Sequence, residues 1–181
     1  MTVPTICTKR LVLRQLEESD AVALHPVLSD AETLHWWWSA PHRTLAETQP
    51  YVARVADQGA GYSCRAITER GDAALGWVTL REKREGVAEI GYILNRNHWG
   101  KGYAREALAV VISHGFDAIG LRRIAADVDP DNAASIALLR SLGFKLDGHL
   151  RGEWETHIGV RDSVIFGLLA HEWVEPLDMI S

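Results

Sequence analysis

The stretch from residue 88 to residue 111, AEIGYILNRNHWGKGYAREALAVV, changes its repeat in the middle. Up to Leu94 the side chains alternate with period two, as in a strand, and from Tyr103 the apolar residues recur at helical spacing. Gly100, Lys101 and Gly102 stand between the two patterns. The sequence therefore predicts a strand that runs through a short glycine turn into the N-terminus of a helix.

A helix that begins in this way offers a site for an anion. Its first backbone N–H groups have no partner within the helix and carry the positive end of the helix dipole, and glycines let a phosphate approach the main chain. Lys101 adds a positive charge. The turn is neither a Walker loop nor a complete dinucleotide-binding fingerprint, because only Gly100-x-Gly102-x-Ala104 is present.

With EIGY before the turn and GYAREAL after it, the segment resembles the acetyl-coenzyme A (acetyl-CoA) loop of the GNAT N-acetyltransferases. That loop reads Gln/Arg-x-x-Gly-x-Gly/Ala, and Trp99 departs from its first position. The resemblance implies that acetyl-CoA is held by the turn and by the end of the preceding strand. The implied cofactor-binding residues are Ile93, Leu94, Asn95, Trp99, Gly100, Lys101, Gly102, Tyr103 and Ala104.

Two more segments carry the same resemblance. T-x-R-L-x-L-R-x-L-x-x-x-D near the N-terminus is similar to the start of the RimJ/RimL-like subgroup, which resembles the ribosomal-protein N-terminal acetyltransferases. DPDNAASIALLRSLGFKLDG is similar to the family's Asn-x-x-Ser/Ala element with a following Leu-Gly-Phe. Asn132 and Ser135 lie on one helical face, and the resemblance implies that both bind the cofactor. If the resemblance is set aside, Asn132 is a helix cap and Ser135 carries a hydroxyl that faces solvent.

The order of the expected elements indicates an α/β (α+β) chain forming a single domain over residues 1–181, with a core from about 8 to 173. The resemblance implies the GNAT fold, a mixed and mostly antiparallel sheet of about seven strands with about four helices. The strand Val87–Leu94 should run parallel to a strand at residues 121–128, because a helix connects them. Gly71-Asp72 should form a hairpin turn.

Composition excludes several classes of function. The formal net charge of −5 gives no general basic field for nucleic acid or an anionic membrane. The apolar runs are shorter than a membrane span requires, and no signal-peptide pattern opens the chain, so we expect a cytoplasmic protein. The two cysteines, Cys7 and Cys64, and the scattered histidines lack metal-site spacing, and no metal is expected.

Acetyl transfer from a thioester to an amine requires that the amine lose a proton. Because an alkyl ammonium has a pKa of about 10.4 and a peptide α-amine about 8, a carboxylate acting directly or through water is a suitable base. Glu89 precedes the turn and shares a strand face with Gly91 and Ile93. It is our candidate for the base, and the alternative is a hydrogen-bonded structural glutamate.

The resemblance also implies partners for the other reacting atoms. A backbone N–H near residues 93–95 would meet the developing oxyanion, where the strand splays from its neighbour. Many GNAT enzymes use a tyrosine as the acid one turn beyond the Asn, but Leu139 stands there. Ser135 is the remaining hydroxyl, and it either protonates the thiolate or positions the cofactor.

Three adjacent tryptophans, Trp36, Trp37 and Trp38, cannot all be buried on one face of a helix or strand, so at least one should be exposed or line a cleft. The resemblance places them in a lid and implies an aromatic wall around the acceptor, whereas the alternative is packing onto the core. In the family, the strand that carries Glu153 and Trp154 borders the acceptor pocket. Simple strand alternation explains these two residues equally well.

Together these features predict an N-acetyltransferase that moves an acetyl group from acetyl-CoA to a primary amine by direct attack in a ternary complex. The acceptor is either a protein N-terminal α-amine or a small molecule, and the sequence does not separate the two. The alternatives are a detoxifying or antibiotic-modifying acetyltransferase and a non-catalytic acetyl-CoA sensor. The resembling subgroup often pairs, which makes a homodimer possible.

Overall fold

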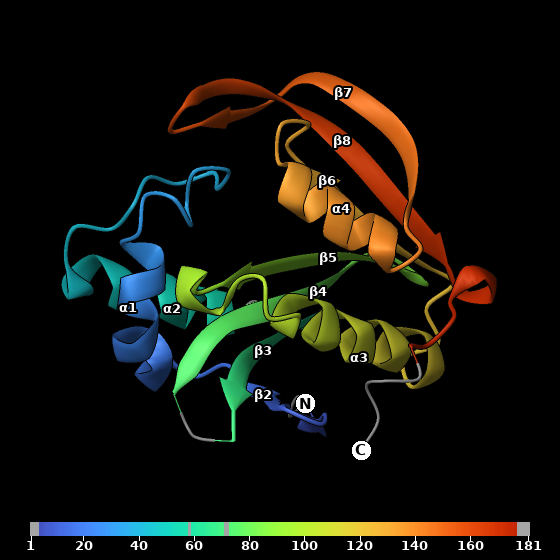
Figure 1. Cartoon of the computed structure of the whole chain (residues 1–181), viewed down its shortest axis with the longest axis horizontal. Helices are drawn as coiled ribbons and strands as arrows, with labels where there is room; N and C mark the ends of the chain where they lie inside the picture. The colour runs from blue at the N-terminus through green and yellow to red at the C-terminus, as the bar shows by residue number, and fades with distance from the viewer. Residues whose placement is uncertain (1–3, 58, 71–72, 177–181) are drawn as a thin grey trace.

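A computed structural model of the chain describes residues 4–57, 59–70 and 73–176. Its eight strands form one sheet in the order β1-β2-β3-β4-β5-β6-β8-β7, and four α-helices accompany it (Figure 1). The strands are β1 (Ile6–Cys7), β2 (Leu11–Gln15), β3 (Tyr62–Glu69), β4 (Ala74–Arg84), β5 (Val87–Leu94), β6 (Arg123–Val128), β7 (Lys145–Thr156) and β8 (Gly159–Leu169). The helices are α1 (Ala21–Leu28), α2 (Leu45–Ala56), α3 (Tyr103–Asp117) and α4 (Ala133–Ser141), with 3-10 turns η1 (Glu18–Asp20), η2 (Arg96–His98) and η3 (Ala170–Glu172). None of the helices in these ranges is long and apolar enough to cross a bilayer.

The expected mixed, mostly antiparallel sheet is confirmed, with one strand more than the seven or so expected. The additional strand is β1, which folds back on β2 and pairs Ile6 with Leu13. Of the pairs among the described strands, β5 with β6 alone is parallel, as predicted from the connecting helix α3. Their ladder covers only Val87–Glu89 of β5, opposite Arg123–Ala125 of β6. From residue 90 onward the two strands separate.

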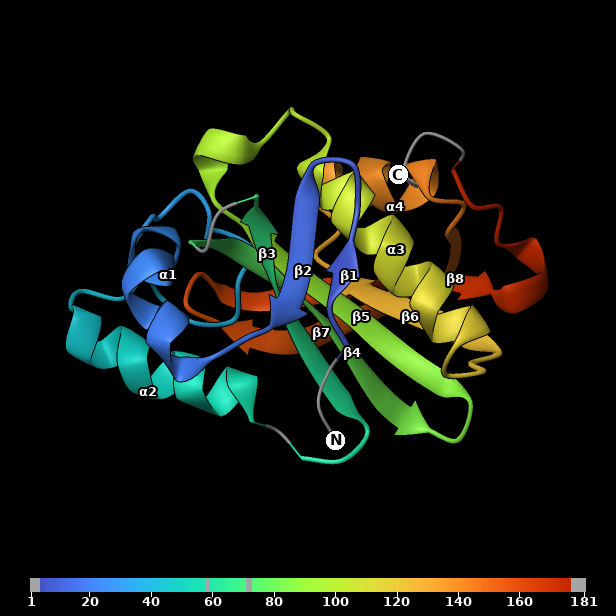
Figure 2. The same ribbon diagram turned by 90° about the horizontal axis from the view of Figure 1, so that it is seen from below.

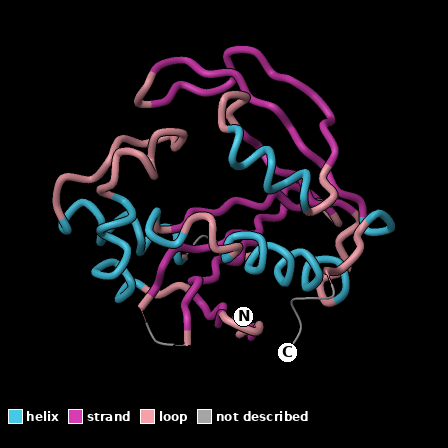
Figure 3. Tube along the Cα trace, viewed as in Figure 1, coloured by secondary structure: helices cyan, strands magenta, loops and turns pink. Residues whose placement is uncertain are grey.

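The two faces of the sheet bury different side chains. On β4, Val78 and Leu80 pack in a cluster with α3 and α4, whereas Trp77 packs in a second cluster with α1 and α2. Strand alternation produces this division, because neighbouring side chains point to opposite faces. Figure 2 shows α1 and α2 grouped together, apart from α3. In Figure 3 the segment between α1 and α2 is a long loop.

A buried carboxylate joins the N-terminal segment to the start of α3. Glu106 accepts hydrogen bonds from the Thr8 hydroxyl at 2.6 Å, from the Arg10 backbone N–H at 3.0 Å and from Arg10 Nε at 2.7 Å. Arg10 Nη2 lies 2.6 Å from the same carboxylate. Glu106 is 3% exposed, so its carboxylate has lost most of its hydration, and these contacts compensate for that loss.

Helix α1 begins directly after Asp20, which is its N-cap residue although the Asp20 side chain makes no capping hydrogen bond to this helix. The chain first makes the 3-10 turn η1, and Asp20 is its last residue. The Asp20 carboxylate accepts from the Glu17 backbone N–H at 2.9 Å and from Arg14 at 2.6 and 2.8 Å. The Asp20 carboxylate therefore caps the start of η1, while Asp20 itself is the N-cap residue of α1. The predicted turn at Gly71-Asp72 lies outside the described residues.

Replacing Glu106 with alanine should lower the free energy of unfolding by about 2 kcal/mol, because the donors of Thr8 and Arg10 would lose their acceptor. Urea unfolding followed by tryptophan fluorescence measures this change. Glu85, an exposed glutamate in the β4–β5 turn, is the matched control, and Glu85→Ala should change the value by less than about 0.5 kcal/mol.

The same contact makes a prediction about pH. Burial alone would raise the pKa of Glu106, but the hydrogen bonds from Thr8 and Arg10 outweigh it and hold the pKa below 4.5. Since the folded-state pKa is the lower one, this stability is present above pH 4.5 and is lost as the pH falls through the folded value. The difference in the free energy of unfolding between wild type and Glu106→Ala should become smaller below pH 4.5. A difference that stays constant with pH would contradict the stabilising role of the ionised Glu106 carboxylate.

Candidate active site

The glycine turn has the backbone that its sequence requires. Gly100 and Gly102 have φ of +70° and +78°, a region that side chains with a Cβ rarely adopt, and Gly102 is the N-cap of α3. A Cβ built on Gly100 would meet nothing within 4 Å. Lys101 is exposed beside them. The helix N-terminus is therefore open on this side, as an anion site needs.

Arg10 holds this turn in place from the N-terminal segment. Its Nη1 donates to the Lys101 carbonyl at 2.8 Å, and its guanidinium lies 4.7 Å from the centre of the Tyr103 ring. The other edge of the same guanidinium contacts Glu106. Sequence reasoning missed Arg10 and Glu106 as positioning residues. Arg10 was part of the N-terminal motif, but nothing in the sequence indicated that this motif touches the turn.

Trp99 stabilises the turn between β5 and α3 through a hydrogen bond within that turn. Its indole N–H donates to the Leu94 carbonyl at 2.8 Å, and the residue is 45% exposed. Asn95 caps η2, with its side-chain oxygen 3.0 Å from the Asn97 backbone nitrogen, and its own N–H donates to the Leu75 carbonyl at 2.7 Å. Leu94 and Asn95 thus end β5 in a defined geometry, although Trp99 replaces the family's usual Gln or Arg.

The face of β5 that is directed to α3 and α4 carries a hydroxyl that sequence reasoning missed. Tyr92 Oη is buried and has no hydrogen bond of normal geometry among the described residues. Burial raises the pKa of Tyr92, and interaction with the Ser135 side chain opposes that rise. The alternation with Ile90 and Leu94 placed Tyr92 on this face, but it could not indicate that the hydroxyl lies near Ser135.

Asn132 and Ser135 come together at the start of α4. The Asn132 side-chain oxygen accepts from the Ser135 backbone N–H at 3.1 Å, which makes Asn132 the N-cap of the helix. This confirms the interpretation of Asn132 as a cap. The Ser135 side chain is half-buried and remains available beside Tyr92.

The opposite face of β5 lines a cavity of about 220 Å³ between α2, the α1–α2 loop and strands β3, β4 and β5. The candidate base Glu89 and Gly91 lie in its wall, as the predicted alternation requires. The complete lining consists of Trp37, Trp38, Tyr51, Arg54, Val55, Tyr62, Trp77, Thr79, Arg81, Glu89 and Gly91. We call this cavity the aromatic pocket.

The Glu89 carboxylate in the pocket wall is paired with two cations. One carboxylate oxygen lies 3.3 Å from Arg81 Nη2, and the other lies 3.1 Å from Lys83 Nζ. The Glu89 side chain is 31% exposed, so water can reach it. The residue therefore has the ion pairs expected of a structural glutamate and the position expected of a base.

The three adjacent tryptophans take three different environments. Trp37 donates its indole N–H to Tyr51 Oη at 2.8 Å and meets Trp77 edge to face. Trp38 stacks on Tyr51 and is 52% exposed. Trp36 lies instead under the guanidinium of Arg161, 5.6 Å from its ring centre. The pocket lining therefore includes Trp37 and Trp38 but not Trp36.

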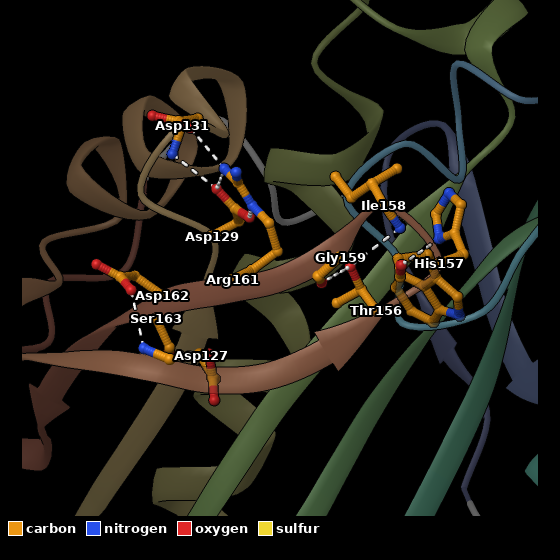
Figure 4. A network of polar contacts seen from close by, with 12 residues as sticks. Asp127, Asp129, Asp131, Thr156, His157, Ile158, Gly159, Arg161, Asp162 and Ser163 are labelled. Atoms are coloured by element: carbon orange, nitrogen blue, oxygen red, sulfur yellow. Dashed lines mark hydrogen bonds and ion pairs between the residues drawn. The ribbon is translucent and has the colours of Figure 1, made fainter.

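The structure does not bring Glu153 and Trp154 to the aromatic pocket. Both are exposed on β7 next to a register shift, and the Trp154 indole N–H donates to Asp127 at 3.0 Å. What reaches the loop of the tryptophans is the tip of the β7–β8 hairpin, where His157 Nδ1 lies 3.0 Å from the Trp37 carbonyl oxygen (Figure 4). The register shift of the hairpin, invisible in the sequence, changes which side chains face inward.

Arg161 ties this hairpin to the entrance of α4. It forms two hydrogen bonds with Asp129, at 2.7 and 3.0 Å, and a third with Asp131 at 2.5 Å (Figure 4). Burial favours the neutral acid at Asp129, but the bonds from Arg161 and from the Asp131 backbone N–H hold its pKa below the usual range. Because Arg161 also covers Trp36, it links the hairpin, the loop of the tryptophans and the turn before α4.

The described residues contain no cluster of three or more His, Cys, Asp or Glu side chains suited to a metal ion. Both cysteines are free, and burial raises the pKa of the Cys64 thiol to about 12. A thiol with such a pKa stays protonated and unreactive. The groups that the site offers are therefore the glycine turn, the hydroxyls of Tyr92 and Ser135, and the Glu89 carboxylate.

Comparison with known proteins places these groups in context. The family model "Acetyltransferase (GNAT) domain" matches residues 10–145. An uncharacterized N-acetyltransferase, p20, from Bacillus licheniformis is 35% identical over 174 residues, covering 93% of this chain and 98% of the relative. Spermidine N(1)-acetyltransferase of Escherichia coli K12 is 26% identical over 165 residues, covering 90% and 87%.

The fold agrees with these matches. The crystal structure of spermidine N-acetyltransferase from Vibrio cholerae, in complex with CoA and spermine, superposes with a TM-score of 0.75 at 24% identity, covering 90% of this chain and 96% of the other. The family model spans the glycine turn, Glu89 and the Asn132–Ser135 cap. The chain thus belongs to the GNAT family of acetyl-CoA-dependent N-acetyltransferases.

Proposed function

We propose that this enzyme transfers the acetyl group to the primary amine of a small molecule by direct attack in a ternary complex. The observation that carries the proposal is the arrangement on β5. Glu89 faces the aromatic pocket on one side of the strand, and Tyr92 faces Ser135 on the other. A thioester lying along the open edge of β5 would have a base on one side and hydroxyls on the other.

The cofactor would run from the glycine turn to this open edge. Its phosphates would accept hydrogen bonds from the first N–H groups of α3, with Lys101 nearby. Beyond residue 89, β5 no longer pairs with β6, so an extended pantetheine arm can take the place of a strand. Because N–H groups alternate between the two edges of a strand and that of Asn95 points to β4, the N–H of Leu94 points to the open edge. It is our candidate for the oxyanion donor.

In the reaction, the amine nitrogen bonds to the acetyl carbon and the carbon–sulfur bond breaks. Before the attack, the ammonium gives one proton to Glu89, directly or through water, so that the neutral amine is the nucleophile. After the attack the nitrogen loses its second proton to the departing sulfur or to water, which leaves the neutral amide. The departing thiolate receives a hydrogen bond from Tyr92 or Ser135. Since a thiol has a pKa of about 8.5, the thiolate can leave without full protonation, and the raised pKa of Tyr92 keeps this hydroxyl a donor.

The pocket favours a small acceptor over a protein N-terminus. Its volume of about 220 Å³ and its aromatic walls suit a compact apolar body. A spermidine acetyltransferase among the relatives supports a small-molecule amine. The RimJ/RimL-like start of the chain supports the second candidate, a protein α-amine. The position of Glu89 in the pocket wall and of Ser135 beside Tyr92 supports an enzyme over a sensor without catalysis.

A panel assay tests the function. Purified protein and acetyl-CoA are incubated with small primary amines and with peptides that differ in their N-terminal residue, and mass spectrometry identifies the acetylated product. We expect acetylated small amines, with one molecule of free CoA released for each molecule of acetylated product. Products confined to peptide α-amines would instead support the second candidate, and CoA binding without any product would overturn the proposal.

Gly100→Ala should weaken acetyl-CoA binding about tenfold, because the added Cβ projects into the space that a phosphate would enter. Calorimetric titration with acetyl-CoA measures the Kd. Gly120→Ala is a matched control, since Gly120 has a φ of +77° and an equally open surrounding but lies at the other end of α3. Equal Kd values in both variants would place the phosphates elsewhere.

Glu89→Gln should lower kcat about a hundredfold at pH 7 without unfolding the protein. With no base, only acceptor that is already neutral reacts, so the deficit should shrink as the pH rises toward the pKa of the amine. Rates from pH 6 to 9 give this profile. Full activity at every pH would rule out Glu89 as the base, and Glu85→Gln controls for the loss of one charge.

Tyr92→Phe should lower kcat about tenfold while leaving the free energy of unfolding unchanged or higher, because the hydroxyl it removes is buried without a normal hydrogen bond. Binding of CoA and of desulfo-CoA, which lacks the sulfur, separates the roles. Wild type should prefer CoA, and Tyr92→Phe should lose that preference. A preference that survives the substitution would mean that Tyr92 does not contact the sulfur.

A further inference from the structure

The charged side chains of the aromatic pocket identify the class of acceptor more narrowly, on the assumption that the pocket is the acceptor site of the proposed function. Its charged lining residues are Arg54, Arg81 and Glu89. The carboxylate of Glu89 already faces two cations, Arg81 and Lys83. The pocket is therefore locally positive, in a chain whose net charge is −5.

Arg54 is the cation of the pocket lining that has no carboxylate partner among the described residues. It is exposed on α2, and no described carboxylate lies within 4 Å of its guanidinium nitrogens. Its guanidinium lies over two rings of the pocket wall, 5.7 Å from the centre of Trp38 and 5.3 Å from that of Tyr51. These rings orient the planar group while its N–H donors remain available for a carboxylate.

The same contacts disfavour a polyamine. The additional ammonium groups of a polyamine need carboxylates or open aromatic faces. Glu89 is the one carboxylate in the lining, and Arg54 already covers Trp38 and Tyr51. Like charges of Arg54 and Arg81 would repel a second ammonium.

We propose that the acceptor is a small amine with an apolar body and a carboxylate. The carboxylate pairs with Arg54, the body lies against the rings that Arg54 leaves uncovered, Trp37, Tyr62 and Trp77, and the amine is directed to Glu89. Spermidine, the substrate in the name of a relative, would then be a poor acceptor here. Specificity comes from a cation on α2, which approaches the acceptor from the side opposite the sheet.

Pairs of acceptors that differ only at the acid test the proposal. L-phenylalanine and 4-(aminomethyl)benzoate place the carboxylate near to and far from the amine, and each is compared with its carboxamide. In wild type we expect kcat/KM to favour at least one acid over its carboxamide by about tenfold or more, and to exceed that for spermidine. The ratio of acid to carboxamide is the readout, because it cancels losses of active protein.

Arg54→Gln should bring that ratio close to one, and Arg54→Lys should keep part of it, since the charge remains but the planar fork is lost. Arg151→Gln, which removes an exposed cation of β7 outside the pocket, should keep the wild-type ratio. Carboxamides or spermidine used better than the acids by wild type would overturn the inference while leaving the acetyltransferase proposal intact. No turnover of any amine would overturn both.

Discussion

The contact on which the site depends is the buried Glu106 carboxylate with Thr8 and Arg10. It satisfies a charge within the first helical turn of α3 using donors from a segment almost a hundred residues earlier. Arg10 then extends from this contact to the Lys101 carbonyl, so the glycine turn is held by the turn between β1 and β2 as well as by its own backbone. The proposed phosphate site consists of main-chain N–H groups, so its precision depends on the position of α3, which this ion pair helps to fix.

Strand β5 then divides the chemistry between two faces. The period of two puts Glu89 and Gly91 toward the aromatic pocket and Tyr92 toward α4, while the loss of pairing with β6 after Glu89 opens the edge between them. One strand thus presents the proposed base on one face, the proposed leaving-group donor on the other, and an open edge between them. The hairpin of β7 and β8 completes the surroundings, because Arg161 lies over Trp36 and His157 contacts the Trp37 carbonyl oxygen.

Much of this could be predicted from the sequence because it follows from local rules. The bounds of β5 and α3, the parallel pairing of β5 with β6 and the cap at Asn132 follow from periodicity, glycine positions and a connecting helix. Glu89 was placed on its strand face by alternation alone. The contacts that could not be predicted join distant segments: Arg10 with Lys101, Tyr92 with Ser135, and Arg54 with two pocket rings. The outward position of Trp154 depends on a register shift that no pattern of residue types encodes.

A crystal structure of the enzyme with bound CoA would show directly which face of β5 holds the cofactor. We expect density for the pyrophosphate at the N–H groups of residues 100–104, for the pantetheine arm along β5 beyond Glu89, and for the sulfur beside Tyr92 and Ser135. The aromatic pocket should stay open on the other side of the strand. Density for CoA on any other surface, or a sulfur on the Glu89 face of β5, would show that the glycine turn and Tyr92 do not form the cofactor site.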